Sequence, residues 1–428
     1  MRIRHTGIFL AVVSVFLYGY TLPGMELNLF VGVLVLVASA TLFTLAKGPL
    51  LVQRRVLVAL VVVLAVGIVG VMLGRGSMSN YLTQAFAISL VVISSTIVVA
   101  GGRELTAKIF PTYLELSFVY ALIAILELAF GLFGIYFEFL TPEIDYAFAN
   151  VHRITGLAAE PAHYCFVMTP SVVAILIGAL LGRPCMSIFK SVVIVLSYIL
   201  TFSSVGFFIL SLVLLAFFFR RSSWSSAKAK VVLAVAVIGL FSSVPQINMR
   251  LVDTYSAFVL GNHANVNLSS LTLYKNAVVT TRSAVDQPIF GAGLGGHEHN
   301  YYKYLPDSLL MLGRNLNERD ANSLFLRLVS EFGVPFTLVF YLLVILLWTG
   351  FPDRRDTSPV YWKKLTSTAI LVLIIAHSLR TGNYISNGFP LFLILYYDAY
   401  RSLKFGDIAA KSLNRVDGAD ACGAARTN

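Results

Sequence analysis

Two polar segments hold most of the residues that could carry chemistry, and each lies between long apolar stretches. In the first, over 151–164, Arg153 and Glu160 lie close to His152 and His163. An arginine guanidinium matches the oxygens of a phosphate group, and a glutamate can act as a general base or bind hydroxyl groups. A simpler interpretation is an ion pair between Arg153 and Glu160. The density of polar groups favours a functional site over the ion pair alone.

The second segment opens with apolar residues at helical spacing, which predicts a helix over 267–285 that ends before Pro288. Lys275 and Arg282 are seven residues apart and therefore share one face of that helix. A helix lying at a membrane surface with its cations toward the headgroups suits a lipid-linked pyrophosphate. An ordinary amphipathic surface helix is the alternative. The apolar stripe consists of Leu271, Tyr274, Val278 and Val285.

A glycine-rich stretch follows, with Gly291, Gly293 and Gly295 ahead of His297 and His299. Its glycines match a dinucleotide-binding string, but no strand–helix context surrounds them, so that interpretation is rejected. A turn of backbone N–H groups that holds an anion fits better. The two histidines and the glutamate between them lack a clear further ligand, so we expect no metal here.

The second segment ends at 320–333, where Asn322 or Ser323 is expected to cap a helix. Arg327 and Glu331 are four residues apart and are expected to pair on one helix face. We expect that pair to be structural and to take no part in chemistry.

Two apolar stretches also carry ionisable residues. His377 and Arg380 share one face near the end of a stretch, and Arg380 is a second candidate to clamp a phosphate. Glu127 lies in another stretch, where exposure to lipid would be costly, so it should face a cavity or a partner. Glu115 lies about 120° away around the same helix, so the two glutamates do not form one site.

Composition says which elements must position these residues. The 428 residues are 57% hydrophobic and only 12% charged, with a mean hydropathy of +0.81. A water-soluble domain carries about 25% charged residues, so a soluble enzyme is excluded. Three cysteines without short spacing favour neither a disulfide framework nor a zinc site.

The sequence predicts an all-α polytopic membrane protein with about twelve transmembrane helices, because each needs about 20 apolar residues. The seventh and eighth stretches are short, so they form either a tight hairpin or one broken helix. The twelve predicted spans are 7–22, 27–46, 56–73, 82–100, 112–134, 164–182, 188–203, 205–219, 231–247, 333–350, 365–380 and 388–402.

Basic residues predict the orientation. With both termini in the cytoplasm, 22 of the 32 lysines and arginines lie on the inner side, as expected for cytoplasmic loops. The net charge of +11 is then an orientation signal, and no nucleic-acid partner is expected. We expect one membrane domain over 1–407 and a polar, disordered cytoplasmic tail over 408–428. Two long extracytoplasmic loops, 135–163 and 248–322, would hold the chemistry.

These loop residues on a twelve-span frame resemble the O-antigen polymerase (Wzy-type) and O-antigen ligase superfamily of bacterial polysaccharide assembly. The resemblance covers the whole topology. Its ligases have a histidine where this chain has Asn322, ahead of Ser323 and Gly333, which favours the polymerase. Three segments carry the likeness: Arg153-x-x-Gly156-x-x-x-Glu160-Pro161, Arg282 with Pro288-x-x-Gly291-x-Gly293-x-Gly295, and Asn322-Ser323 with Gly333.

The resemblance implies a metal-independent glycosyltransferase without a cofactor, in the bacterial inner membrane with its site facing the periplasm. It would join undecaprenyl-pyrophosphate-linked repeat units into O-antigen or exopolysaccharide, beside membrane lipids, a chain-length regulator and a flippase of the same pathway. The implied catalytic residues are Arg282, Arg153 and Arg380 for the pyrophosphate and Glu160 as base, with His163 and His297 behind it. Lys275, His377, Gly291, Gly293, Gly295, Asn322 and Ser323 are expected to contact substrate.

Two alternatives stay open. A ligase would move finished glycan to a lipid or protein acceptor. A twelve-span transporter or lipid-linked-sugar flippase would instead show two similar halves, whereas this chain places its bulk in one late outer loop. Glu127 keeps the transporter open.

Overall fold

The computed structural model describes residues 2–17, 31–47, 53–100, 103–135, 146–148, 151–158, 160–220, 245–263, 265–312 and 317–405. Its regular structure is helical there, apart from a short antiparallel pair, β1 (Tyr146–Phe148) and β2 (Val151–His152). The predicted helical class is therefore confirmed. The predicted tail over 408–428 lies outside the described residues.

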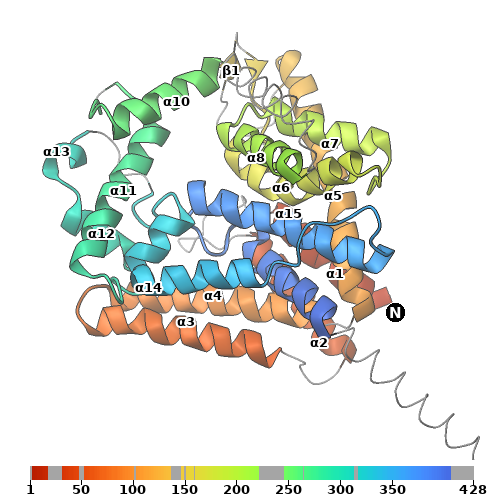
Figure 1. Ribbon diagram of the computed structural model, residues 1–428, viewed down its shortest axis with the longest axis horizontal. Helices are drawn as coiled ribbons and strands as arrows, with labels where there is room; N and C mark the ends of the chain where they lie inside the picture. The colour runs from red at the N-terminus through yellow and green to blue at the C-terminus, as the bar shows by residue number, and fades with distance from the viewer. Residues whose placement is uncertain are drawn as a thin grey trace, which may run out of the picture.

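Figure 1 shows two helical groups and a cap. Helices α3, α4 and α14 run side by side along one edge, α5 to α8 form a second group, and α15 packs against α6 between them. Helices α10 to α13 lie together at one end. The bounds are α1 Arg2–Phe16, α2 Val31–Lys47, α3 Arg54–Met72, α4 Met78–Val99, α5 Arg103–Leu132, α6 Pro161–Leu180, α7 Ile188–Leu200, α8 Ser204–Arg220, α10 Pro245–Phe258, α11 Leu268–Asp286, α12 His297–Tyr304, α13 Asp307–Leu310, α14 Leu324–Leu346 and α15 Ser358–Arg380. A 3₁₀ turn, Ser386–Gly388, and a helix over 389–405 follow.

Six helices of the described residues are long and apolar enough to cross a membrane: Arg54–Met72, Met78–Val99, Ala107–Leu132, Pro161–Leu180, Leu324–Leu346 and Ser358–Arg380. Shorter apolar helices lie at the predicted first, second, seventh and eighth spans. Most of the predicted ninth span, 231–247, lies outside the described residues. The chain is thus a helical, multi-pass membrane protein by length and composition, and the count of twelve stays a prediction.

Burial agrees with lipid as the solvent. Helix α6 is buried along nearly all of its length by its neighbours, whereas α3 exposes Val58, Val61 and Val62. Exposed apolar side chains of this kind are expected where a helix faces hydrocarbon. Between α7 and α8 the chain turns at Phe202, whose φ is +48°, so these are two separate helices.

The tenth predicted span starts earlier than expected. Helix α14 begins at Leu324, where the Ser323 hydroxyl accepts from the backbone N–H of Leu326, so the predicted cap is confirmed at Ser323. At Gly333 the φ is +82°, and the helix kinks. The freed N–H of Val334 donates to the Pro288 carbonyl. The kink is therefore the point at which the backbone of Pro288 and Ile289 contacts α14.

Candidate functional site

A closed polar cluster joins α11, α12 and α14. The Nε2 of His297 lies 2.8 Å from Asn276 Oδ1, and its Nδ1 lies 2.9 Å from Ser330 Oγ. The Asn276 amide donates to the Thr272 carbonyl, which turns its oxygen toward the histidine. The Nε2 therefore carries the proton, and Nδ1 accepts from Ser330. Asn300 in turn donates to Ser330 Oγ at 3.0 Å.

This cluster corrects the role expected for His297. Its side chain is fully buried, and desolvation lowers its pKa to about 3. Both ring nitrogens already have partners, so the ring is neutral and closed to a substrate. We therefore assign His297 to holding the outer helices on α14 and remove it from the candidate bases.

The glycine-rich stretch is also a docking element. The N–H groups of Ala292, Gly293 and Leu294 donate to the carbonyls of Ser330, Glu331 and Gly67. A Cβ at Gly70 would lie 2.3 Å from the nitrogen of Gly293, so α3 and this stretch meet backbone to backbone. The anion-binding turn predicted at Gly291, Gly293 and Gly295 is therefore wrong. The N–H groups of Gly291 and Gly293 donate to protein carbonyls, and all three glycines, at positive φ, pack against neighbouring backbone.

The Arg327–Glu331 ion pair is confirmed. Arg327 Nε lies 2.9 Å from Glu331 Oε1, and both side chains are buried. Arg327 also donates to the Gly382 carbonyl and lies 4.1 Å from the centre of the Tyr384 ring, whose hydroxyl donates to Glu331. Tyr384 was not expected from the sequence, because its partners lie more than 50 residues away.

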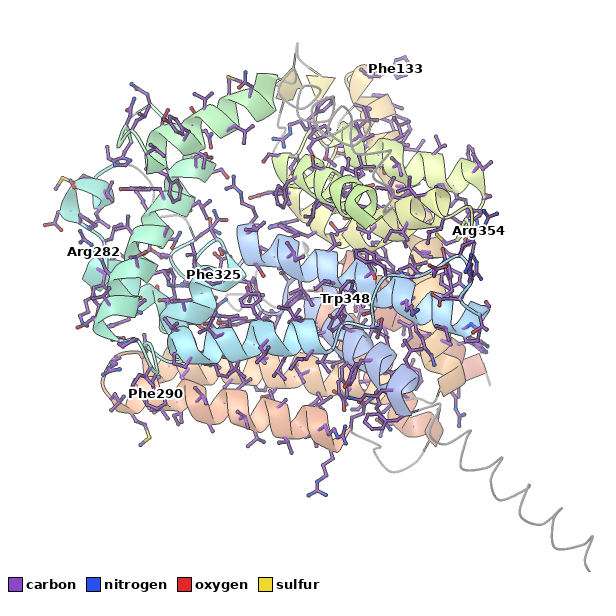
Figure 2. All side chains as sticks on the ribbon, viewed as in Figure 1. Phe133, Arg282, Phe290, Phe325, Trp348 and Arg354 are labelled. Carbon is purple, nitrogen blue, oxygen red and sulfur yellow. The ribbon has the colours of Figure 1, made fainter. Side chains whose placement is uncertain are left out.

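Arg282 lies away from the membrane helices. Figure 2 shows it at the outer edge of the α11–α13 group. It is exposed, and its Nη1 donates to the Tyr304 carbonyl at 3.1 Å. Lys275, on the same face two turns earlier, is only 1% exposed. The expectation that both cations face the headgroups together is thus wrong, because the rest of the protein covers only the first half of that face.

The first polar segment folds against its neighbours. Arg153 donates to the carbonyls of Thr201 and Phe202 at 3.1 and 3.5 Å, which braces the turn between α7 and α8. The carboxylate of Glu127 accepts from the Gly156 N–H at 2.6 Å and from Thr155 at 3.2 and 3.3 Å. The prediction that Glu127 faces a partner is confirmed. Glu115 instead pairs with Lys190 at 2.5 Å, so the two glutamates belong to different contacts.

Four predicted residues lie at the ends of α6 and α15, and a fifth, Lys275, lies in the middle of α11, which Arg380 contacts. Helix α6 begins after Glu160, which is exposed and makes no capping bond through its side chain, and His163 lies in its first turn. Helix α15 packs on α6 and carries His377 and Arg380 in its last turn. Arg380 donates to the Ser269 carbonyl and hydroxyl at 3.4 and 3.2 Å, which ties α15 to α11. We give the name cation cluster to the cations Lys275 and Arg380 taken together with three further predicted residues, Glu160, His163 and His377.

Two members of the cation cluster are buried without a hydrogen-bond partner in the described part of the chain. These are the Lys275 ammonium and both ring nitrogens of His377. Desolvation lowers the pKa of Lys275. His377 lies between aromatic rings, 4.4 Å from the Phe389 centroid and 5.0 Å from that of Phe166, and His163 is within its electrostatic reach. Unsatisfied polar groups of this kind are rare in folded proteins and indicate a missing partner.

The remaining predicted residues make contacts of their own outside the cation cluster. His299 is exposed, and Glu298 accepts from Asn80 and from Arg319. Asn322, at a φ of +52°, donates through its N–H to Asp320, and the Ser323 hydroxyl donates to the Ser378 carbonyl. In the described residues no group of three His, Cys, Asp or Glu side chains converges as metal ligands would. Asn322 and Ser323 therefore shape the entry to α14.

Sequence reasoning missed Asn276, Asn300 and Ser330, which build the closed polar cluster. Amide and hydroxyl residues recurring on otherwise apolar helix faces were the available signal. No protein-family model matches this chain, and no curated protein matches it either.

Proposed function

We propose that the chain is a glycosyltransferase that polymerises lipid-pyrophosphate-linked oligosaccharide repeat units, with its site on the extracytoplasmic face of the bacterial inner membrane. The observation that supports it most is Lys275. A buried ammonium without a partner is costly, and a protein that keeps one usually uses it. Arg380, bonded to the first turn of the same helix, adds a second cation.

The cation cluster supplies what this transfer needs. The acceptor hydroxyl oxygen forms a bond to the anomeric carbon of the donor sugar, and the bond from that carbon to the pyrophosphate oxygen breaks. The electron pair leaves with the lipid pyrophosphate, whose growing charge Lys275 and Arg380 stabilise. The hydroxyl proton passes to Glu160, which is exposed at the start of α6, or to the neighbouring His163.

Three residues of the original expectation change roles in this proposal. Arg282 is exposed at the edge of the α11–α13 group, His297 is closed within the polar cluster, and Arg153 braces the turn between α7 and α8. Their contacts account for them without substrate. Stabilisation of the departing pyrophosphate is therefore assigned to Lys275 and Arg380.

A ligase would use the same donor chemistry and differ only in its acceptor, so it remains the second candidate. Asn322 favours the polymerase, because the histidine typical of the ligases is absent there. A transporter is less well supported. The contacts of Glu127 with Thr155 and Gly156 explain a buried carboxylate without an ion pathway.

The test uses purified protein in lipid vesicles, supplied with a lipid-pyrophosphate-linked repeat unit and no metal. Wild type should give a ladder of products on a gel. Lys275→Met should lose product formation at least about 100-fold, as expected when a charge that stabilises the leaving group is removed. Because methionine removes an unpaired buried charge, this variant should be at least as heat-stable as wild type.

Arg282→Met is the matched control, since it removes a cation of the same helix face that is exposed. It should retain product formation within about threefold, because an exposed contact of this kind is worth under 1 kcal/mol. A ladder from Lys275→Met equal to that of wild type would contradict the proposed site. A single transfer to a different acceptor by wild type would indicate the ligase.

A further inference from the structure

Helix α10 presents apolar side chains away from the protein. Leu251, Val252, Tyr255, Phe258 and the following Val259 are 60%, 54%, 55%, 44% and 64% exposed. With 100° between successive residues, all five fall within an arc of about 120°. The arc contains no charged side chain. This surface is therefore a continuous apolar stripe.

The opposite face of α10 is polar and bound to the protein. Asp253 accepts from the backbone and side-chain N–H groups of Asn267 at 3.1 and 2.6 Å, and Thr254 lies 2.9 Å from Ser270 through their hydroxyls. Ala257, between these contacts, is fully buried. A surface helix of a water-soluble protein has the reverse arrangement, with its apolar face inward. The medium outside α10 is therefore apolar.

Helix α10 is too short to cross a membrane. Its 14 residues extend about 21 Å, which is shorter than the roughly 30 Å hydrocarbon core of a membrane. The helix begins at the end of the predicted ninth span, 231–247. It also contacts α8, which itself exposes Phe208. Helix α10 is therefore packed beside a membrane helix that exposes an apolar side chain of its own.

We propose that α10 is embedded in the outer leaflet of the membrane, with Leu251, Val252, Tyr255, Phe258 and Val259 in contact with lipid chains. An amphipathic helix binds in this way, along one leaflet with its apolar face toward the acyl chains. The stripe has no charged side chain and one polar group, the Tyr255 hydroxyl. Tyrosine is enriched at the membrane interface, where its ring lies among lipid and its hydroxyl among the headgroups. The outer loop therefore begins with a membrane-bound helix, and α11 is attached to its polar side.

The test measures where single labels on α10 lie. Cys185→Ala and Cys422→Ala remove two native thiols, and Cys165 is left in place because it is fully buried. Single cysteines then replace Leu251, Tyr255 or Val259, all more than half exposed, and carry a nitroxide. The protein is reconstituted in phosphatidylethanolamine–phosphatidylglycerol vesicles. Collision rates are measured with oxygen, which concentrates in lipid, and with a water-soluble nickel chelate.

The matched control is a nitroxide at Arg282, which is exposed on α11. The ratio of oxygen to nickel collisions should be several-fold higher at all three α10 positions than at position 282. Equal ratios at these positions would overturn the proposal. Rates at α10 that fall as the protein-to-lipid ratio rises would show a second copy on the stripe and overturn it too. The measurement needs no enzymatic activity, so its outcome is independent of the proposed function.

Discussion

Among the described residues, Arg327 and Glu331 form the ion pair with the least exposed side chains, at 3% and 0%. Breaking such a pair leaves one charge without compensation in a medium of low polarity. Arg327→Met or Glu331→Gln should therefore lower the free energy of unfolding by about 3–5 kcal/mol. The double variant should lose less than the sum, because neither charge remains. Heat denaturation of the detergent-solubilised protein measures both effects.

The exposed pair between Arg319 and Glu298 provides the control for this prediction, because 76% of the Arg319 side chain is exposed. Arg319→Met should change the melting temperature little, as most surface ion pairs contribute under about 1 kcal/mol. If the Arg327→Met and Arg319→Met variants had the same melting temperature, the Arg327–Glu331 pair would not hold α14 to the Gly382–Tyr384 segment.

At the residue scale, local spacing predicted what depends on one helix. Arg327 and Glu331 meet because four residues separate them. The role of Arg153 could not be predicted in this way, because the carbonyl that it contacts most closely belongs to Thr201, 48 residues away. The burial of individual side chains could not be predicted from the sequence either. Nothing in the pattern around Lys275 and Arg282 distinguishes the covered end of the helix face from the open end.

At the element scale, helices were predicted well where caps and breakers mark them. Asn267 caps α11 by accepting from Ser270, and the helix ends at Asp286, ahead of Pro288. The glycine-rich stretch was interpreted wrongly for a physical reason. Its glycines are needed where it approaches α3 at Gly67 and Gly70, and no local feature of 291–296 identifies that distant partner.

The contact of α12 with α11 and α14 should depend on pH through His297. The unfolded chain binds a proton on this histidine at a pH of about 6.5, whereas the folded chain binds it only near 3. Between these values the unfolded state holds more protons, so the free energy of unfolding falls as the pH is lowered. The loss between pH 8 and pH 5 should be about 2 kcal/mol. It is measured as a shift in melting temperature.

Two glutamine variants separate this histidine from other groups that titrate in the same range. His297→Gln should weaken the pH dependence by this contribution, because an amide can still donate and accept but cannot be protonated. His299→Gln, at an exposed position, should keep the full dependence of wild type. Equal pH dependence in both variants would mean that His297 does not contribute.

For the whole molecule, composition alone predicted the class. A chain with 12% charged residues folds with lipid around it, and six helices of the described residues have the length and hydropathy to cross a membrane. The number of crossings was harder to predict. Helix α7 has 13 residues, fewer than a bilayer requires, and α8 has 17, at the lower limit. The predicted span 231–247 lies mostly outside the described residues.

The charge pattern nevertheless predicts a topology that can be tested directly. Single cysteines at Lys303 and Arg319 should react with a membrane-impermeant maleimide in intact spheroplasts, because both positions are exposed and belong to the predicted outer loop. Cysteines at Lys228, Arg354 and Lys404 should react only after permeabilisation, because inner loops attract the excess of basic residues. Labelling on opposite sides for 228 and 303 requires an odd number of crossings between them, and the predicted ninth span supplies one. Labelling of both positions from the outside would contradict the predicted ninth span. Labelling of position 354 from the outside would mean that α14 and α15 have the opposite orientation, with the cation cluster on the cytoplasmic side.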